Sequence, residues 1–283
     1  MYNNQVYDIE KQIHDSVVVE ELDRKERLVR YISENLNIPV KHLENDKTIV
    51  DILMQLQREH NPMIYEFNED IWIFLANNME AEKDLQDSRI SGKNNFYNRS
   101  KAKAYIDTNW DNYNPAYPTF HGGGGDCANF VSQVLYAGGM PWVDDRNPNH
   151  YTWFTNWYCK PGASNKDGDK RITLSWKVAA AFKRHWEKRA AKQLVISYKD
   201  AMDNMRDLSK QVFLGDPVQF CYANGTPYHT LIVTGYAWDK DAGVNDIVLA
   251  SHTIDSNRRS LYNTIRKYPK DYQLRFYIIK EEA

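Results

Sequence analysis

The sequence has no apolar run long enough to cross a bilayer. Its longest, residues 71–76, falls far short of the roughly 18 residues that a membrane-spanning helix needs. There is no excess of one charge either, because 36 Lys and Arg residues stand against 38 Asp and Glu residues. This balance argues against a protein that binds nucleic acid through a basic field, so we expect neither a nucleic-acid partner nor a membrane span.

Cysteine is also scarce, since the 283 residues include three, at positions 127, 159 and 221. Three thiols cannot form a complete set of disulfides and their spacing matches no metal motif, so we expect a free thiol, no metal and no other cofactor. The first four residues lack the basic-then-apolar plan of a secretion signal. We therefore expect a cytoplasmic protein, or a secreted one if a leader has been removed.

The hydrophobic content of 42% suffices for a sizeable core, and the chain changes character near residue 91. Apolar residues at helical spacing predict three helices before that point, at residues 9–36, 48–57 and 68–87. The small, polar stretch 91–95 is typical of a linker. We therefore predict a helical N-terminal region of unknown role, residues 1–90, and a second domain, residues 91–283.

The second domain is predicted to place helices before strands. Helical patterns cover residues 98–110, 128–136 and 175–192, and a Trp- and Asn-rich irregular stretch lies between the last two. Short runs rich in Val, Ile, Tyr and Phe predict about four antiparallel strands, at residues 212–222, 230–238, 247–252 and 272–280. The order of these elements predicts an α+β fold.

Cys127 stands at the first turn of a predicted helix, and one residue, Asp126, separates it from the four consecutive glycines 122–125. Backbone N–H groups and the helix dipole favour an anion at such a position and lower the pKa of a thiol. The glycines also keep bulky side chains away from the sulfur. Cys127 is therefore the candidate nucleophile, with a small buried cysteine as the structural alternative. Cys159 and Cys221 lack this setting and are interpreted as structural.

Two histidines could serve such a thiol, because thiolate catalysis needs an imidazole and a group that orients it. His229 opens one predicted strand and His252 ends the next. If these strands are antiparallel neighbours, the two rings meet at one edge of the sheet. We predict that one ring nitrogen of His229 faces Cys127 and the other faces His252 or Asp255. Two strand-end histidines in solvent are the alternative.

The run from Gly125 to Leu135, followed by residues 137–139, resembles the signature of the putative amidase domain family, a branch of the papain-like NlpC/P60 superfamily of cysteine peptidases and amidases. Weaker matches appear in the expected order at residues 97–102, 114–117, 215–218, 228–235 and 251–253. The resemblance covers about residues 94–280 and leaves the first ninety unexplained. It implies a papain-like domain whose nucleophile lies at a helix N-terminus packed on the antiparallel sheet.

The resemblance also implies roles for residues. Cys127 would be the nucleophile, His229 the general base and then the acid, and His252 the third residue, with Asp255 as its alternative. The oxyanion would be held by the Cys127 backbone N–H and a second donor. The candidates for that donor are Tyr117 and His121.

A substrate cleft is expected around the same motif. Gly124 and Gly125 would let a substrate backbone approach closely, whereas Asp126 is expected mainly to fix the turn. The long insertion between Cys127 and His229 could form a wall or a lid. Trp153 and Trp157 in that insertion, together with Trp142 and Tyr158, are expected either to line an exposed cleft or to form a second small core.

The leading hypothesis is a bacterial cysteine amidase or peptidase, a hydrolase that cleaves an amide bond through a thioester. By analogy its substrate is a peptide or a peptidoglycan stem peptide. A transferase would use the same residues but pass the acyl group to an amine or thiol. A catalytically degenerate peptide- or glycan-binding module is the third hypothesis. The substrate, the bond cut and the oligomeric state are not fixed by the sequence.

Overall fold

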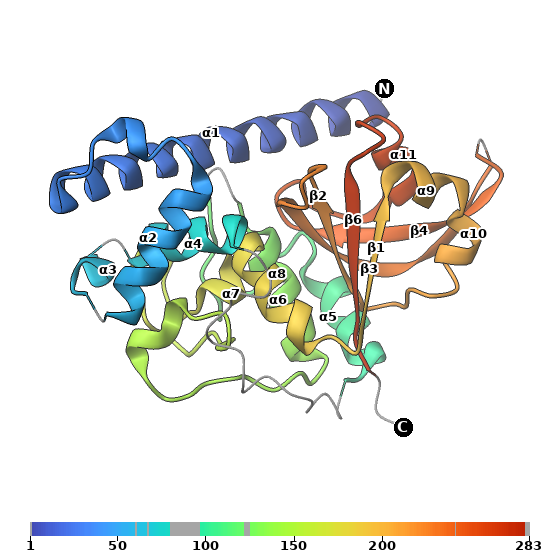
Figure 1. Ribbon diagram of the computed structural model, residues 1–283. Helices are drawn as coiled ribbons and strands as arrows, with labels where there is room; N and C mark the ends of the chain where they lie inside the picture. Colours follow the sequence, from blue (N-terminus) through green and yellow to red (C-terminus); the bar gives the residue numbers. More distant parts are fainter. Residues whose placement is uncertain are drawn as a thin grey trace.

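The computed structural model describes residues 2–59, 61–66, 68–79, 97–121, 125–240 and 242–280. Helices occupy one half of the molecule and an antiparallel sheet the other, and the first helix runs along both halves (Figure 1). The predicted linker at 91–95 lies outside the described residues, as does Gly124.

The N-terminal region is helical, as predicted. Its elements are α1 (Tyr2–Leu36), η1 (Val40–His42), α2 (Asp46–Arg58), α3 (Met63–Glu66) and α4 (Asn68–Asn78). The Asn45 side chain begins α2 by accepting a hydrogen bond from the Lys47 backbone N–H. Apolar residues of these helices, including Leu28, Leu53 and Phe74, are buried together. Hydrophobic burial therefore explains why this charged segment folds.

The N-terminal helices share this hydrophobic core with the middle of the chain. Phe154, Leu174 and Ala181 belong to the same buried cluster as α2 and α4. Helix α8 (Ala179–Arg189) packs on α4, and its Arg184 donates from Nε to the Ala76 carbonyl at 2.8 Å. The interface between the two predicted parts is therefore apolar and hydrogen-bonded.

One six-stranded antiparallel sheet forms the other half, in the order β1-β6-β2-β3-β4-β5. The strands are β1 (Lys192–Ser197), β2 (Pro217–Cys221), β3 (Pro227–Asp239), β4 (Val244–Ser251), β5 (Ser256–Ser260) and β6 (Gln273–Ile278). Four of them match the predicted runs, but the predicted count of about four is wrong. The residues of β5 are all polar and give no strand signal, and β1 directly follows a helical pattern.

Helices cover both faces of this sheet. Those of the second half are α5 (Arg99–Asn109), α6 (Cys127–Ala137), η3 (Pro148–Thr152), α7 (Leu174–Lys177), α8, α9 (Tyr198–Asp203), α10 (Met205–Leu208) and α11 (Leu261–Ile265). Along β3, Ile232 packs with α6 and α8, whereas Leu231 packs with α9, α10 and α11. The helix predicted at 175–192 is interrupted at Val178, whose backbone is extended.

The tryptophans of the insertion are mostly core residues. Trp157 and Tyr158 are fully buried, and Trp157 packs against Trp176 and Trp186. An exposed cleft lined by Trp157 is therefore a wrong expectation, because the insertion folds back onto α6 and α8. Trp153 is partly buried and stacks on His150, with ring centroids 3.4 Å apart. Within the described part of the chain, no helix has both the length and the apolar character that a membrane crossing requires.

Candidate active site

Cys127 is the first residue of α6 and is 2% exposed. The turn before it depends on Gly125, whose φ of 57° lies in the left-handed region. A Cβ on Gly125 would also lie 2.3 Å from Oγ1 of Thr253. The same Oγ1 accepts the Asp126 backbone N–H at 2.7 Å. Glycine is therefore required where the turn meets the end of β4.

The thiol of Cys127 is surrounded by donors. The backbone N–H groups of Thr230 and Ala128 and the hydroxyl of Thr230 hydrogen-bond to the sulfur and favour the thiolate. Burial acts in the opposite direction and is the larger effect, so it raises the pKa of the Cys127 thiol above its ordinary value. The expected lowering of this pKa is therefore not what this environment produces.

His229 lies on β3, next in sequence to the threonine that contacts the thiol, and is 2% exposed. Its Nε2 is 3.2 Å from Nη1 of Arg259 on β5, and its Nδ1 has no hydrogen-bond partner among the residues described. Because arginine only donates, Nε2 is the acceptor and Nδ1 holds the hydrogen. Burial, and then the charge of Arg259, lower the pKa of His229 well below its ordinary value. His229 is therefore a neutral imidazole at pH 7.

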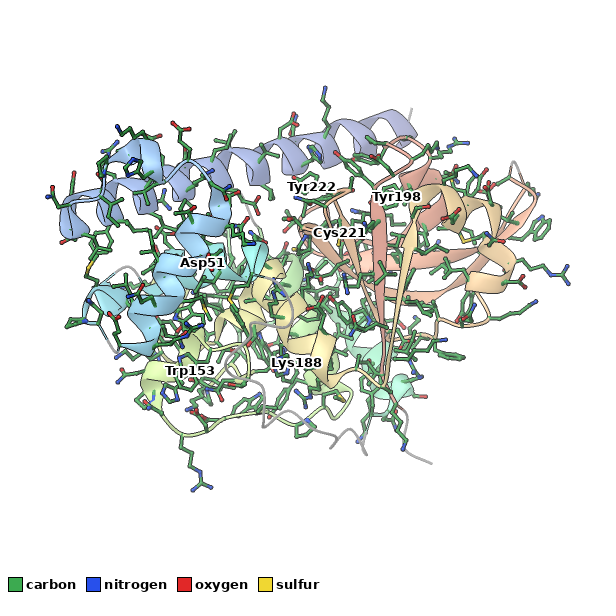
Figure 2. All side chains as sticks on the ribbon, viewed as in Figure 1. Asp51, Trp153, Lys188, Tyr198, Cys221 and Tyr222 are labelled. Carbon is green, nitrogen blue, oxygen red and sulfur yellow. The ribbon has the colours of Figure 1, made fainter. Side chains whose placement is uncertain are left out.

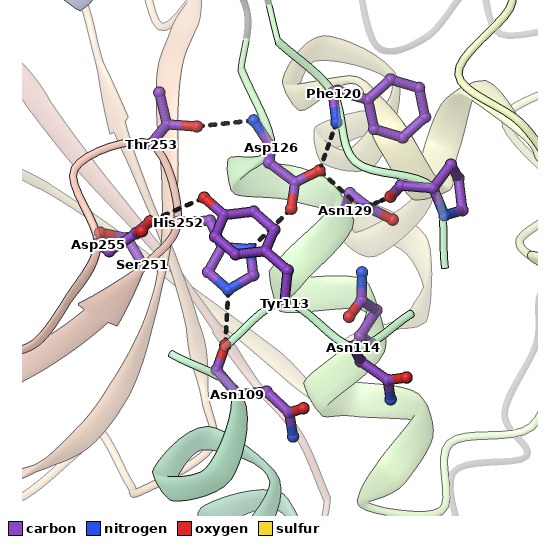
Figure 3. A network of polar contacts seen from close by, with 12 residues as sticks. Asn109, Tyr113, Asn114, Phe120, Asp126, Asn129, Ser251, His252, Thr253 and Asp255 are labelled. Carbon is purple, nitrogen blue, oxygen red and sulfur yellow. Dashed lines mark hydrogen bonds and ion pairs between the residues drawn. The ribbon is translucent and has the colours of Figure 1, made fainter. Parts of the chain in front are cut away.

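His252 follows β4 directly and has a different set of neighbours (Figure 3). Its ring is stacked between Tyr113 and Phe130, with centroids 3.9 and 4.0 Å away. Nδ1 is 2.7 Å from Oδ2 of Asp126, and Nε2 is 2.8 Å from the carbonyl oxygen of Asn109. Both ring nitrogens are therefore occupied by acceptors. The expected contact between His252 and His229 is not formed.

Asp255 does not face His229 through a hydrogen bond either, because its Oδ1 accepts from the Tyr113 hydroxyl at 2.8 Å. The turn between β4 and β5 is strained, since Thr253 and Ile254 have φ values of 60° and 72°. Its hydrogen bonds include one from the Asp126 N–H to Thr253 and two to the Ile254 carbonyl, from Nη2 of Arg259 at 3.0 Å and from Oγ of Ser251 at 3.2 Å. The turn therefore contacts both Asp126, which is the partner of His252, and Arg259, which is the partner of His229.

Asp126 fixes the turn before the nucleophile, as expected. Its Oδ1 accepts the Phe120 backbone N–H at 3.0 Å and Nδ2 of Asn129 at 2.8 Å. It does not cap its own helix with its side chain, and it is 1% exposed. A carboxylate this deeply buried does not line an open cleft. Asn129 continues the network, because its Oδ1 accepts from Nε1 of Trp176 at 2.9 Å.

The two candidate oxyanion donors lie in different places. Tyr117 is stacked on Trp176 at 6.0 Å, and burial raises the pKa of its hydroxyl to about 12. His121 is exposed and lines a cavity together with Gly125. The assignment of the second oxyanion donor stays a prediction.

That cavity has a volume of about 920 Å³. Gly125, two residues before Cys127, and Tyr228, immediately before His229, both line it. Helices α1 and α4 and the start of α8 form much of its wall, which is also lined by Phe120, Tyr151, Asn165, Asp167, Gly168 and Lys177. Sequence reasoning missed this contribution of the N-terminal helices, because no motif in them indicates a ligand. The residues described include no group of three His, Cys, Asp or Glu side chains that could hold a metal ion.

Buried titratable side chains beside a large cavity define an enzyme-like site on an α+β scaffold. The chain belongs to the family described as "Putative amidase domain", whose model matches residues 96–279. The description of this family names an amidase-type activity. The first ninety-five residues, including α1 and α4, lie outside the matched segment.

The chain is also similar to a protein of Bacillus subtilis (strain 168) named "Uncharacterized protein YhbB". The two are 29% identical over 183 residues, which cover 64% of this chain and 48% of that protein. The chain thus spans about half the length of this curated relative. No solved structure gives a significant match.

Proposed function

We propose that the protein is a cysteine amidase or peptidase of the papain-like NlpC/P60 type, with Cys127 as its nucleophile and His229 as its base. The observation that supports this most is the position of the Cys127 sulfur. It lies at the first turn of α6 against the Thr230 backbone N–H, so that the thiol adjoins the residue next to His229. The cavity is lined by Gly125 and Tyr228, so a substrate in it would lie beside the turn before Cys127 and the start of β3 before His229.

The reaction begins when the sulfur attacks the carbonyl carbon of the amide and His229 takes the thiol proton. The Cys127 backbone N–H and a second donor, Tyr117 or His121, stabilise the oxyanion. The C–N bond then breaks, and the amine leaves with the proton from His229, so that a thioester remains. Water, deprotonated by His229, hydrolyses the thioester and restores the thiol.

The contact between Arg259 and His229 must change before this reaction can begin. Arg259 occupies Nε2 of His229 as a donor, which leaves the hydrogen on Nδ1 and no lone pair for the thiol. The raised pKa of Cys127 and the lowered pKa of His229 likewise favour an uncharged resting pair. Substrate binding must therefore release Nε2 from Arg259 or rotate the ring before His229 can accept the thiol proton.

A peptide is the substrate class that the cavity suits best. A volume of about 920 Å³ lies at the upper end of the roughly 300–1,000 Å³ range of ligand pockets and leaves room for several residues. A peptidoglycan stem peptide remains the default by analogy with the family.

Alkylation by iodoacetamide, mapped to each cysteine by mass spectrometry, tests the nucleophile. Cys159 and Cys221 are matched controls, because burial raises the pKa of each thiol to about 12. Figure 2 shows Cys221 within the sheet. Burial raises the pKa of all three thiols, but among them Cys127 has N–H and O–H donors that favour its thiolate, so we expect Cys127 to react fastest and His229→Ala to slow it. Equal, slow reaction of all three thiols, or peptide hydrolysis that survives Cys127→Ala, would contradict the proposal. The degenerate binding module would then be favoured.

A further inference from the structure

The cavity beside the proposed nucleophile has one wall that the amidase segment does not supply. Helix α1 contributes Glu20, Glu21, Arg24 and Arg27 to it, and α4 contributes Asp70 and Asn77 among others. These residues all precede residue 96, where the family match begins. A ligand in the cavity would therefore contact side chains from outside the matched segment as well as from within it.

Helix α1 is fixed on both sides of the cavity. On the sheet side, Nε2 of His14 is 3.1 Å from the Tyr272 hydroxyl, and the Tyr222 hydroxyl donates to the His14 carbonyl at 3.3 Å. Figure 2 shows Tyr222 between the sheet and α1. On the helical side, Arg24 and Arg27 both pair with Asp70 of α4, at 3.1 and 3.0 Å. The helix is thus a positioned wall of the cavity.

The cations of the wall are already paired. Arg24 also contacts Glu20 at 3.0 Å, and Lys177 contacts Glu69 at 3.2 Å. Among the described lining residues, five carboxylates stand against three Lys and Arg side chains, so the lining is net negative. A negatively charged ligand would therefore meet no unpaired cation on this wall.

These pairs leave over two lining carboxylates, which are the exposed Asp167 and, on the wall formed by the N-terminal helices, Glu21. Its Oε1 accepts from Nδ2 of Asn77 at 2.7 Å, and no ion pair to it occurs among the residues described. Burial raises the pKa of Glu21, which is the response of a carboxylate with too little compensating charge. The remaining polar atom of Asn77, Oδ1, is a buried acceptor without a hydrogen-bond partner in the described part of the chain. Oδ1 of Asn77 therefore lacks a donor, and the Glu21 carboxylate beside it has no ion pair among the residues described.

We propose that the cavity beneath α1 is a substrate subsite in which Glu21, supported by Asn77, selects peptides that carry an ammonium group. This inference rests on the proposed peptide-cleaving function. An ammonium has three donors, no acceptor and a positive charge, so it can donate to the Glu21 carboxylate and neutralise it. The N-terminal helices would thereby determine the specificity of a cysteine site built by the second domain.

The test uses the full chain with Cys127→Ala, so that binding is measured without hydrolysis. Two N-acetylated tripeptide amides serve as probes, one with lysine and one with norleucine at the central position, and calorimetry at low salt gives their affinities. We expect the lysyl peptide to bind about tenfold more tightly. Adding Glu21→Gln should reduce this preference to about twofold or less. Glu26→Gln is the matched control, because Glu26 is exposed on the same helix and pairs with Arg30 at the surface.

Each outcome separates the two proposals. Equal binding of both probes, no binding of either, or a lysyl preference that Glu21→Gln leaves intact would overturn the subsite, even if the wild-type enzyme hydrolyses peptides through Cys127. A lysyl preference that depends on Glu21 would support the subsite even if no peptide were hydrolysed. In that second case the amidase proposal would fail and the subsite would stand.

Discussion

Nδ1 of His252 lies 2.7 Å from Oδ2 of Asp126, both side chains being almost completely buried. The histidine that was expected to orient His229 therefore holds the residue immediately before the proposed nucleophile. Its second nitrogen is bound to the Asn109 carbonyl, so the ring connects α5, the end of β4 and the start of α6. His252 is thus a positioning residue for Cys127.

We expect His252→Ala to destabilise the fold strongly. The change leaves the Asp126 carboxylate buried without its partner, for which about 3–5 kcal/mol is typical. Urea unfolding measures the loss, and Asp255→Asn is the control, because Asp255 is exposed and bonds only the Tyr113 hydroxyl among the contacts described. A loss for His252→Ala no larger than that for the control would show that the buried pair contributes little.

The free energy of unfolding should fall in acid because of His229. Its pKa in the folded chain is well below the ordinary value of 6.5, so below about pH 6.5 the unfolded chain binds a proton that the folded chain does not. The stability that neutral His229 contributes is therefore fully present above pH 6.5. As the pH falls below that value, the free energy of unfolding decreases by up to about 1.4 kcal/mol per pH unit. His229→Gln cannot titrate, so its unfolding free energy should depend less steeply on pH than that of the wild type.

Comparing these two proteins by urea unfolding between about pH 8 and about pH 5 isolates His229. Burial also lowers the pKa of His185, and this adds the same pH dependence to the unfolding free energy of both proteins. Asp216, whose pKa burial raises to about 6, acts in the opposite direction in both. Parallel curves for the two proteins would contradict the assignment of a neutral, buried His229.

Arg259→Gln should raise the pKa of His229. The glutamine amide can still donate to Nε2, but it lacks the positive charge that disfavours the imidazolium. Titration of the isotope-labelled histidine rings by NMR, in a Cys127→Ala background, reads this pKa without any activity assay. Arg258→Gln is the control, because Arg258 is the exposed neighbour on the same strand. An unchanged pKa would mean that the charge of Arg259 does not act on His229.

Local patterns predicted most of the architecture but little of the pairing at the site. The helix at Cys127 and the strand after His229 follow from short-range apolar spacing and were found. The partners of His252 come from α5 and from the turn before α6, more than a hundred residues away, and no sequence spacing specifies them. Trp157 was misjudged for the same reason, because burial depends on how the insertion packs on α6 and α8.

The position of Glu21 in the cavity wall could not be predicted from the sequence. On α1 Glu21 is one acidic residue among many, and only the packing of α1 across α4 and the sheet turns it toward a cavity next to Gly125. Arg259 is a similar case, since β5 contains no apolar residue and gave no sign of a strand beside His229. Long-range packing therefore determines both the wall of the cavity and the partner of His229.

The turn before Cys127 requires glycine at position 125. Gly125→Ala places a Cβ in the left-handed region at a φ of 57°, and 2.3 Å from Oγ1 of Thr253. Backbone strain and steric overlap together should lower the free energy of unfolding by about 2–5 kcal/mol. Gly243→Ala is the matched control, because Gly243 has a φ of 66° but no atom within 4 Å of the new Cβ. It should therefore lose about 1–2 kcal/mol from strain alone.

Urea unfolding gives the two losses, and the alkylation rate of Cys127 reports whether the turn still presents the thiol. Because Thr253 also accepts the Asp126 N–H, displacing it should move the residue next to the nucleophile, and Gly125→Ala should slow alkylation of Cys127. Gly243→Ala lies in the β3–β4 turn and should leave that rate unchanged. If both variants lost equal stability and kept the same alkylation rate, contact with Thr253 would not be the reason for glycine at position 125.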